Sequence, residues 1–424
     1  MDGYLKRIVD RELDELLPGL PAISLEGPKG VGKTVTALRR ATTVRRLDDP
    51  DELVALLATP RRIVEGPPPV LIDEWQRYPS SWDLVRRAVD DGRGGGRFLL
   101  TGSVPPVDWP MHSGAGRIVS MRMRPLGLPE RALVTPTVSL AELLVGDRPD
   151  VAGASPLTVV DYATEIVASG FPDLRAEAER VRRTRLDGYL DRIAERDFPE
   201  QGMALRDPAG LLRWLRAYAA ATATTATFET IRDAATAADG ITPARSTTIA
   251  YRRVLEQLWI VDPVPAWLPT FNHIARIAGP AKHHLADPAL AARLLGADVG
   301  ALLTPRPLGP PVFRDGPLLG RLFESLVTLG VRVCAQAAEA KVRHLRTRAG
   351  IHEIDLIVER ADQRVVAIEV KLASLVDDRD VRHLHWLGEQ IGPDLLDKVV
   401  LTTGPEAYRR QDGVAVVPAA LLGP

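Results

Sequence analysis

Apolar residues in the first third of the chain recur in two patterns. Between residues 4 and 17 they fall at helical intervals, which predicts a helix before the first strand. Short apolar runs, typical of buried strands, follow at 22–25, 43–47, 69–72, 97–100 and 118–123. Helix-like segments such as 51–58 separate these runs. Strands that alternate with helices in this way predict an α/β fold.

The middle of the chain reads as helical. Residues 161–219 follow a helical period, and further helices are expected at 211–221, 228–238 and 243–259. A tight turn at 239–242 separates the last two, which is helix-turn-helix spacing. Apolar segments at 258–261 and 267–268 could then supply the wing of a winged-helix domain.

The expected third helix begins with arginine and hydroxyl side chains. Arg245 is followed by Ser246, Thr247 and Thr248, and Arg252 and Arg253 lie further along. Such side chains suit a recognition helix in a DNA groove. Winged-helix modules also serve as lids or protein contacts, so both interpretations stay open.

The C-terminal part returns to strands. A linker rich in glycine and proline at 296–317 precedes a helix near 320–327. Strand-like runs follow at 341–347, 351–358 and 365–371. This order predicts a second α/β domain.

Composition narrows the class of protein. A chain of 424 residues is too long for one ordinary core, and 45% hydrophobic with 26% charged residues is typical of soluble globular domains. The net charge of −1 gives no global electrostatic case for nucleic acid, so a basic surface must be local. The single cysteine, Cys334, excludes an internal disulfide and a cysteine-based zinc site.

Targeting signals are missing from the pattern. The segment 1–17 lacks the apolar core of a signal peptide, and no apolar run is long enough for a membrane span. We expect a cytoplasmic protein with no membrane partner. Only seven of the 54 basic residues are lysines, so each lysine is weakly enriched for sites that need an ammonium group; Lys33 and Lys371 both lie in candidate motifs.

A phosphate-binding motif follows the first predicted strand. It fits the pattern GxxxxGK[ST] and comprises Gly27, Pro28, Lys29, Gly30, Val31, Gly32, Lys33 and Thr34. Glycines let backbone N–H groups and the start of a helix surround a phosphate. Lys33 would reach the β- and γ-phosphates of ATP, and the Thr34 hydroxyl would bind Mg²⁺.

Two acids end the apolar run at 69–72, which is the Walker B arrangement. Asp73 would hold Mg²⁺ through water, and Glu74 would orient the attacking water. Ser103, after the next strand, could sense the γ-phosphate, or could simply belong to a turn at the strand end. Arg117 could act as an arginine finger in cis or in trans.

A second constellation of acids lies in the C-terminal domain. The order is Glu324 in a helix, Asp355 on a strand, then Glu369 and Lys371 on the next strand, which is the PD-(D/E)XK nuclease arrangement. Residues two apart share one face of a strand, and Asp355 can lie beside them across the hairpin. The three acids could hold Mg²⁺, and Lys371 could position a water against a phosphodiester. Equally, the fold could persist without cleavage, with the acids in a structural role.

The motifs together resemble a known family. GPKGVGKT, LIDEWQRYP, FLLTGS, GRI and RPLGLPE are similar to prokaryotic AAA-type ATPases that carry a C-terminal domain of unknown function with a restriction-endonuclease-like fold. The segments Phe171-Pro172-Asp173 and Glu195-Arg196-Asp197 resemble the family's GxP and RD segments. The resemblance implies an ATPase core at 1–150, a helical and winged-helix domain at 155–300 and a nuclease-like domain at 310–424.

Two functions follow as expectations. In the first, the chain binds and hydrolyses ATP and couples its nucleotide state to DNA binding or metal-dependent DNA cleavage. In the alternative, it is a nucleotide-gated DNA- or protein-binding regulatory module with an inert nuclease-like domain. ATP and Mg²⁺ are the expected cofactors, and double-stranded DNA and a second copy of the chain are the candidate partners.

Overall fold

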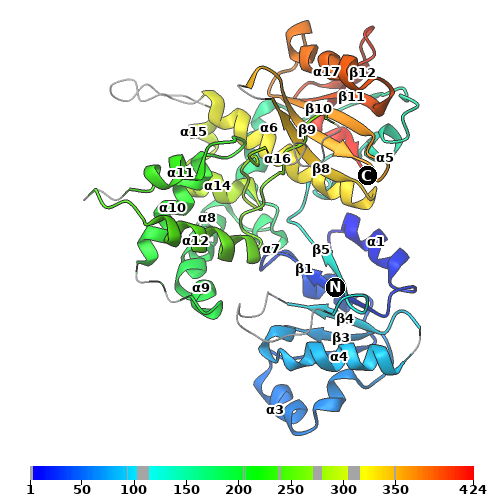
Figure 1. Cartoon of the computed structure of the whole chain (residues 1–424), viewed down its shortest axis with the longest axis vertical. Helices are drawn as coiled ribbons and strands as arrows, with labels where there is room; N and C mark the ends of the chain where they lie inside the picture. Colours follow the sequence, from blue (N-terminus) through cyan, green and yellow to red (C-terminus); the bar gives the residue numbers. More distant parts are fainter. Residues whose placement is uncertain are drawn as a thin grey trace.

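The computed structural model describes residues 3–92, 94–102, 114–203, 205, 207–236, 240–270, 279–303, 316–347 and 350–424. Ser103 lies outside these residues. Figure 1 shows an N-terminal sheet at the bottom, a C-terminal sheet at the top, and a group of helices beside both. None of the helices in the described ranges has both the length and the apolar composition that a membrane crossing requires.

The N-terminal sheet is parallel, in the order β2-β3-β4-β1-β5. Its strands are β1 (Ala22–Glu26), β2 (Thr43–Arg46), β3 (Val70–Asp73), β4 (Phe98–Thr101) and β5 (Val119–Arg122). The helices are α1 (Ile8–Leu16), α2 (Lys33–Leu38), α3 (Pro50–Ala58) and α4 (Ser80–Asp91), with short 3-10 turns η1 (Pro60–Val64), η2 (Trp75–Arg77) and η3 (Leu128–Glu130). All five strands predicted here from the apolar runs are confirmed. In parallel α/β sheets, ligands bind at the carboxyl ends of the strands.

The C-terminal sheet has the order β7-β12-β13-β11-β10-β9-β8. Its main strands are β8 (Lys341–Arg346), β9 (Glu353–Glu359), β10 (Val365–Lys371), β11 (Leu395–Thr402), β12 (Glu406–Arg409) and β13 (Ala415–Pro418). Helix α16 (Gly316–Ala337) packs on one face and α17 (Asp378–Ile391) on the other, followed by η6 (Gly392–Asp394). Alternate residues of β10 face the two helices: Val366 and Ile368 belong to the α16 side, whereas Val365 and Ala367 belong to the α17 side.

The segment around residues 138–154 pairs with strands from the C-terminal part of the chain, within two different sheets. Strand β6 (Val138–Ser139) pairs with β14 (Leu422–Gly423), and β7 (Gly153–Ala154) pairs with β12. Helix α5 (Leu140–Leu143) and the turn η7 (Ala419–Leu421) lie between these elements. The structure therefore differs from the expected ATPase boundary at residue 150, because pairings of two residues leave no readable strand pattern.

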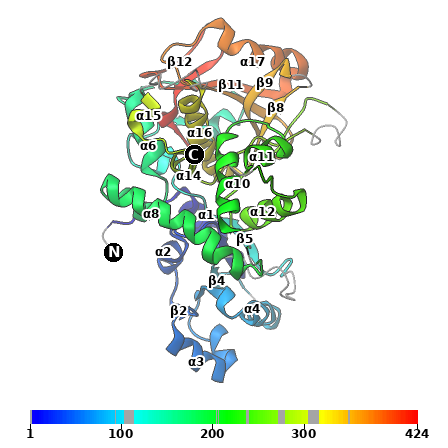
Figure 2. The same cartoon turned by 90° about the vertical axis from the view of Figure 1, so that its left-hand side faces the viewer.

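The middle region is helical, as predicted. It contains α6 (Val159–Ala168), α7 (Pro172–Arg175), α8 (Glu179–Arg192), the π-helical turn η4 (Ile193–Asp197), α9 (Phe198–Glu200), α10 (Pro208–Ala220), α11 (Phe228–Ala234), α12 (Arg245–Gln257), α14 (Pro288–Leu294) and α15 (Val299–Leu303). Figure 2, in which this region faces the viewer, shows α8, α10, α11 and α12 gathered between the two sheets. Buried aromatic rings of Phe198, Trp214 and Tyr251 join α9, α10 and α12.

The expected wing differs from the prediction. Backbone bridges pair Val261 with Leu285 and Val264 with Lys282, so the segments 260–266 and 280–286 form an antiparallel pair, here called the ribbon. Its first segment continues onto β8 through a bridge from Ala266 to His344. Trp267 is 1% exposed and packs in the C-terminal core, so it does not serve as a wing tip. The pattern misled because a buried apolar segment looks the same whether it covers a sheet edge or forms a wing.

An acidic residue of the ribbon joins three parts of the chain. The Asp262 carboxylate is 3.0 Å from the Arg122 guanidinium, 3.3 Å from that of Arg124 and 2.8 Å from that of Arg332 on α16. Burial alone would raise the pKa of Asp262, but the three guanidinium groups outweigh it and hold this pKa well below its usual range. The ribbon is thus fixed to both the N-terminal sheet and the C-terminal domain.

Candidate nucleotide site and C-terminal acidic cluster

The loop between β1 and α2 has the backbone that a phosphate loop needs. Gly27, Gly30 and Gly32 have φ values of 155°, 83° and 96°, in the region where side chains are strained. A Cβ atom at Gly27 would clash with the backbone oxygen of Met123. Gly32 is the N-cap of α2, so backbone N–H groups at the start of this helix face the loop. The sequence therefore fixes a concave backbone beside a helix N-terminus.

The lysine of the motif, Lys33, reaches back over this loop. The Lys33 ammonium group donates to the backbone oxygens of Gly27 at 2.8 Å and Pro28 at 2.9 Å. Burial lowers the pKa of Lys33 to about 8, against the effects of nearby Glu74 and Asp73. A lysine that is this buried and bonded only to loop carbonyl oxygens is placed to exchange them for phosphate oxygens.

Asp73 lies at the carboxyl end of β3, next to the loop. Its Oδ1 accepts a hydrogen bond from the Thr34 hydroxyl at 2.8 Å and a short one from Thr101. Thr101 is the partner of Asp73 in the pairing of β3 with β4. Thr101 is thus a polar residue of this strand end that contacts Asp73, while the predicted Ser103 lies outside the described residues.

Glu74 and Arg117 have contrasting positions. Glu74 follows Asp73 with a left-handed φ of 53°, a strained conformation that often marks functional sites, and its carboxylate accepts from Gln76. Arg117 precedes β5 and pairs with Asp90 at 2.6 Å, near the end of α4. Since the strands are parallel, Arg117 lies at the amino ends of the strands, whereas the phosphate loop lies at their carboxyl ends. It does not reach the loop within one chain, so its action on a second copy stays a prediction.

The middle region covers the phosphate loop. The Lys29 ammonium group is 2.6 Å from Asp197 and 3.2 Å from Glu200, and the Tyr189 hydroxyl donates to the Lys29 carbonyl oxygen at 3.2 Å. Burial opposes the charged form of Lys29, but the two carboxylates outweigh it and raise its pKa. Asp197 is 6% exposed, whereas the Lys29 side chain is 36% exposed, so only the acidic side of this ion pair is buried.

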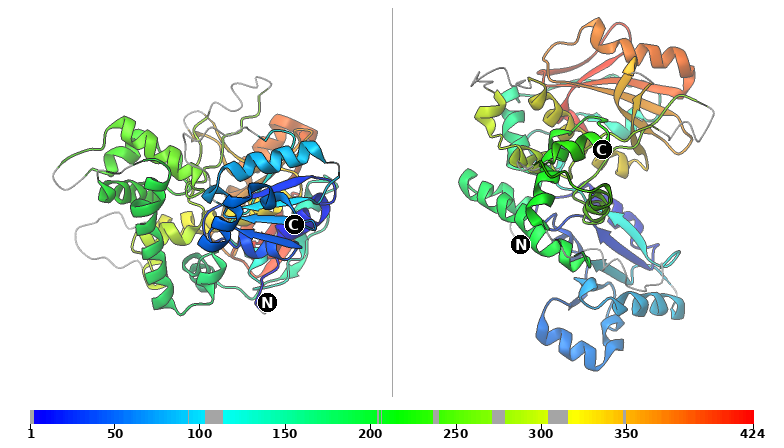
Figure 3. Two further views of the ribbon diagram at one scale, coloured as in Figure 1. Left: turned by 90° about the horizontal axis from the view of Figure 1, so that it is seen from below. Right: turned by 60° about the vertical axis from the view of Figure 1, so that its left-hand side comes forward.

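Two further residues of the middle region touch the glycines of the loop. A Cβ atom at Gly30 would lie 3.7 Å from the Phe171 ring, and one at Gly32 would lie 3.9 Å from Pro172. Figure 3 (left) shows the middle helices grouped along one side of the N-terminal sheet. The resemblance pointed to the segments that hold Phe171 and Asp197 but gave them no role; the structure shows that both lie against the loop.

ATP and Mg²⁺ fit this arrangement. The glycine backbone and the start of α2 can surround a phosphate, and Lys33 supplies a buried positive charge. Thr34 and Asp73, already joined by a hydrogen bond, are the oxygen donors that Mg²⁺ prefers. When bound, the ion would neutralise charge on the phosphate oxygens.

The residues of the nuclease-like constellation also lie together. Asp355 accepts from the Val370 backbone N–H at 2.9 Å, across the β9–β10 hairpin, and Lys371 donates to Glu369 at 3.1 Å. Burial and the charge of Asp355 raise the pKa of Glu369 well above its usual range. The buried Oε1 of Glu369 has no hydrogen-bond partner among the described residues. The structure thus brings Asp355, Glu369 and Lys371 together on the β9–β10 hairpin.

The cluster nevertheless contains a cation from another part of the chain. The Lys282 ammonium group lies 2.8 Å from Glu324 and 3.0 Å from Asp355, and Lys282 is fully buried. Within the described ranges, no group of three or more His, Cys, Asp or Glu side chains is arranged to hold a metal ion. The arrangement therefore does not fit the expected Mg²⁺ at Glu324, Asp355 and Glu369. Nothing in the sequence pattern around Lys282 signalled this contact.

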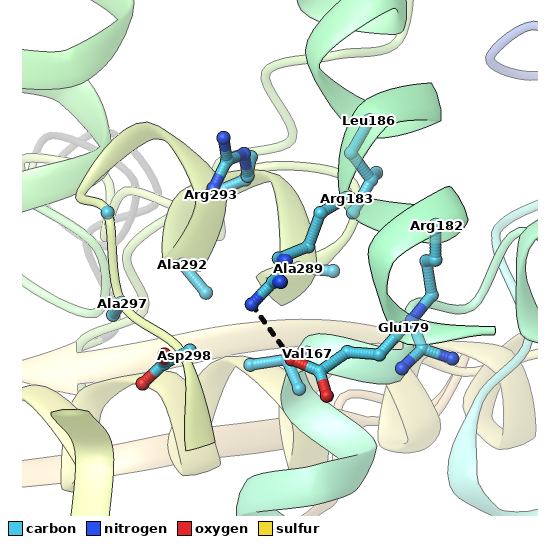
Figure 4. Close-up of a pocket in the computed structure, with 11 residues that line it drawn as sticks. Val167, Glu179, Arg182, Arg183, Leu186, Ala289, Ala292, Arg293, Ala297 and Asp298 are labelled. Atoms are coloured by element: carbon cyan, nitrogen blue, oxygen red, sulfur yellow. Dashed lines mark hydrogen bonds and ion pairs between the residues drawn. The ribbon is translucent and has the colours of Figure 1, made fainter. Parts of the chain in front are cut away.

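A separate cavity of about 300 Å³ lies among α6, α8 and α14 (Figure 4). Val167, Leu186, Ala289 and Ala292 form its apolar wall. Two of its arginines are engaged with acids: Arg183 pairs with Glu179, and Arg293 pairs with Asp187. This cavity is distinct from the phosphate loop, which lies at the opposite end of α8.

Comparison with known families assigns the first domain. Residues 20–132 match the family described as AAA domain. Residues 160–300 and 319–422 match two families described as domains of unknown function, DUF8612 and DUF4143. The AAA match and the geometry of the phosphate loop identify an AAA-type P-loop ATPase domain, and the chain is an ATPase. The C-terminal match specifies no fold or activity, so the restriction-endonuclease-like fold stays a prediction.

Comparison with individual proteins adds little. No curated protein matches the chain. Among solved structures, a Walker-type ATPase of Pyrococcus abyssi is similar at a TM-score of 0.40 and 16% identity, over 69% of this chain and 96% of that chain. The ORC2 protein of Aeropyrum pernix, in ADPNP–ADP complexes, is similar at a TM-score of 0.26 and 15% identity, over 68% and 90%. At these TM-scores neither likeness supports a conclusion.

Proposed function

We propose that the chain is a nucleotide-gated switch, in which ATP binding and hydrolysis at the phosphate loop change the state of the middle region. Lys33 would bind the β- and γ-phosphates, Thr34 and Asp73 would hold Mg²⁺, and Glu74 would orient the attacking water. The observation that carries the proposal is the ion pair from Lys29 of the loop to Asp197 of the middle region. A phosphate that reshapes the loop also acts on this ion pair. The nucleotide state would therefore change the position of η4 and α9 directly.

The position of Asp197 supports this coupling. It ends a π-helical turn between α8 and α9, and such irregular turns frequently occur at functional sites. The turn places Asp197 on the loop while Phe198, the next residue, is fully buried against the aromatic core. A shift of Asp197 would therefore act on a packed helix pair, which is the kind of element that transmits a local change.

Hydrogen exchange of the whole protein, with and without ADP or a non-hydrolysable ATP analogue, tests the coupling. We expect nucleotide to change exchange in residues 189–200 of the wild-type chain and not of Lys33→Ala. Asp197→Asn should retain ATP binding but lose this change, whereas Glu195→Gln, an exposed residue of the same turn, should behave as wild type. Identical exchange in 189–200 with and without bound nucleotide would refute the proposal.

Duplex DNA is the partner that the surface of α12 favours. The Arg245 side chain is 75% exposed at the start of this helix, and Arg253, about two helical turns later, is also exposed. Arg252 is less available because its guanidinium lies over the Phe228 ring at 4.3 Å. Phosphate contacts by arginine make binding salt-dependent.

Fluorescence anisotropy with a short duplex, at two salt concentrations and with or without ATP, tests this partner. Arg245→Ala should weaken binding and reduce its salt dependence. Arg183→Ala removes an arginine of α8 that pairs with Glu179, and should leave binding unchanged. Equal affinities of the two variants would assign any DNA binding to another surface.

A second copy of the chain is the partner that the position of Arg117 suggests. The Arg117 side chain is 43% exposed and lies at the opposite end of the strands from its own phosphate loop, so an arginine finger from this position would have to act on a neighbour. ATPase activity that rises with protein concentration and falls in Arg117→Ala would support this assembly. Activity per chain that is independent of concentration would argue against it.

A further inference from the structure

Backbone hydrogen bonds fix the residue whose side chain enters the C-terminal acidic cluster. Lys282 lies on the second segment of the ribbon, where its backbone N–H donates to Val264 at 2.9 Å and its carbonyl oxygen accepts from Val264 at 2.8 Å. The neighbouring residues His283 and His284 are each 2% exposed and hydrogen-bond to Tyr218 and Ser325 respectively. The ribbon thus has little freedom to withdraw the lysine.

The ammonium group is placed between carboxylates, as a bound cation would be. It donates to Glu324 Oε1 at 2.8 Å and to Asp355 Oδ1 at 3.0 Å, and Glu353 Oε1 lies at 3.7 Å. Lysine has three N–H donors, and Glu324 and Asp355 accept from two of them. Since Lys282 is 0% exposed, its charge has to be balanced within the protein.

The same oxygens cannot serve a metal at the same time. Mg²⁺ needs oxygen ligands at about 2.0–2.1 Å in octahedral geometry. Glu324 and Asp355 are engaged by Lys282, the second oxygen of Asp355 accepts from the Val370 N–H, and Glu369 is paired with Lys371. A divalent ion here would also lie beside the buried ammonium group of Lys282 and that of Lys371, whose side chain is 31% exposed, and like-charge repulsion disfavours this.

We infer that Lys282 supplies the cation of this cluster in place of a divalent metal. The cluster of Glu324, Asp355 and Lys282 is then a buried ion-pair lock that docks the ribbon on the C-terminal domain, and it is not a metal-dependent nuclease centre. This inference is independent of the nucleotide gating proposed above, because none of its residues contacts the phosphate loop.

Manganese binding to the full-length protein tests the inference. Titration by electron paramagnetic resonance, without nucleotide and in a Lys33→Ala background, removes the contribution of the ATP site. We expect no Mn²⁺ site that depends on Asp355 when Lys282 is present. An Mn²⁺ site in this protein that disappears in Asp355→Asn would overturn the inference.

Removing the lysine gives the complementary result. Lys282→Ala leaves the acids without their cation, and we expect it to gain an Mn²⁺ site that a further Asp355→Asn change abolishes. If circular dichroism shows that Lys282→Ala is unfolded, Lys282→Gln, which keeps most of the side-chain volume, is used in its place. A folded variant of either kind that gains no Mn²⁺ site would show that the lysine does not stand where a metal would bind, and would also overturn the inference. Lys398→Ala, on β11, is the matched control and should gain nothing.

Discussion

Replacing Asp262 by asparagine should destabilise the whole chain strongly. The side chain keeps its size but loses the charge that faces Arg122, Arg124 and Arg332. Only 8% of the Asp262 side chain is exposed, so water cannot replace the carboxylate as a partner for the three guanidinium groups. The variant therefore leaves buried positive charges without compensation.

The size of the effect follows from this geometry. Breaking a buried ion pair by removing one partner costs about 3–5 kcal/mol, because the remaining charge is left uncompensated. The matched control is Asp233→Asn, which removes a 2.9 Å pair with Arg232 from a side chain that is 63% exposed. Exposed pairs contribute about 0–1 kcal/mol. The two substitutions make the same chemical change and differ in burial.

Urea unfolding, followed by tryptophan fluorescence, gives the free energies of unfolding. With an unchanged m value, Asp262→Asn should lower the midpoint by roughly 1–2 M urea, and Asp233→Asn by a few tenths. The pKa of Asp262 is depressed in the folded chain, so its contribution is present above about pH 4, the unfolded value, and is lost as pH falls toward the folded value. The wild type and Asp262→Asn should therefore converge in stability at acid pH. A loss at neutral pH no larger than that of Asp233→Asn would refute the reasoning.

Three further substitutions and one control test the ATPase domain. Gly27→Ala should abolish nucleotide binding in a filter or calorimetric assay, because its Cβ would clash with the Met123 carbonyl oxygen; near-normal affinity would contradict the loop geometry. Glu74→Gln should bind ATP and lose most hydrolysis in a phosphate-release assay, whereas Gln76→Ala, which removes only the partner of Glu74, should retain measurable turnover. Asp49→Ala removes the N-cap of α3 and should lower the free energy of unfolding by about 1 kcal/mol, with unchanged ATP affinity; a loss of affinity would mean that α3 contributes to the site.

The nucleotide site could be predicted because its chemistry lies in short contiguous segments. Gly27, Lys33 and Thr34 belong to one short motif, and the apolar run before Asp73 marks this residue as the end of a buried strand. The order of strands in the sheet then brings the two segments together. Which polar residue at the end of β4 contacts Asp73 could not be chosen from the sequence, since that choice depends on register; the structure shows Thr101 there.

Contacts between remote segments could not be predicted from the pattern. Lys29 belongs to the predicted motif, but its partner Asp197 follows it by 168 residues. Lys282 lies 73 residues before Asp355, and its neighbours gave no sign of an acidic partner. The scarcity of lysine in the chain was the available signal, and it was applied to Lys33 and Lys371 but not to Lys282. Such pairings depend on tertiary packing, which local spacing does not contain.

The ribbon limits how the nucleotide signal can spread. Its first segment buries the acidic Asp262 against arginines of the N-terminal sheet and α16, and its second segment buries the basic Lys282 against acids of the C-terminal domain. Separating either contact would expose or strand a buried charge at a cost of about 3–5 kcal/mol. The Lys29–Asp197 pair, by contrast, includes a lysine side chain that is 36% exposed, so it can open at much lower cost. We therefore expect ATP binding to move α8 and α9 while the ribbon stays docked. Hydrogen exchange should then depend on nucleotide in α8 and α9 and not in the ribbon.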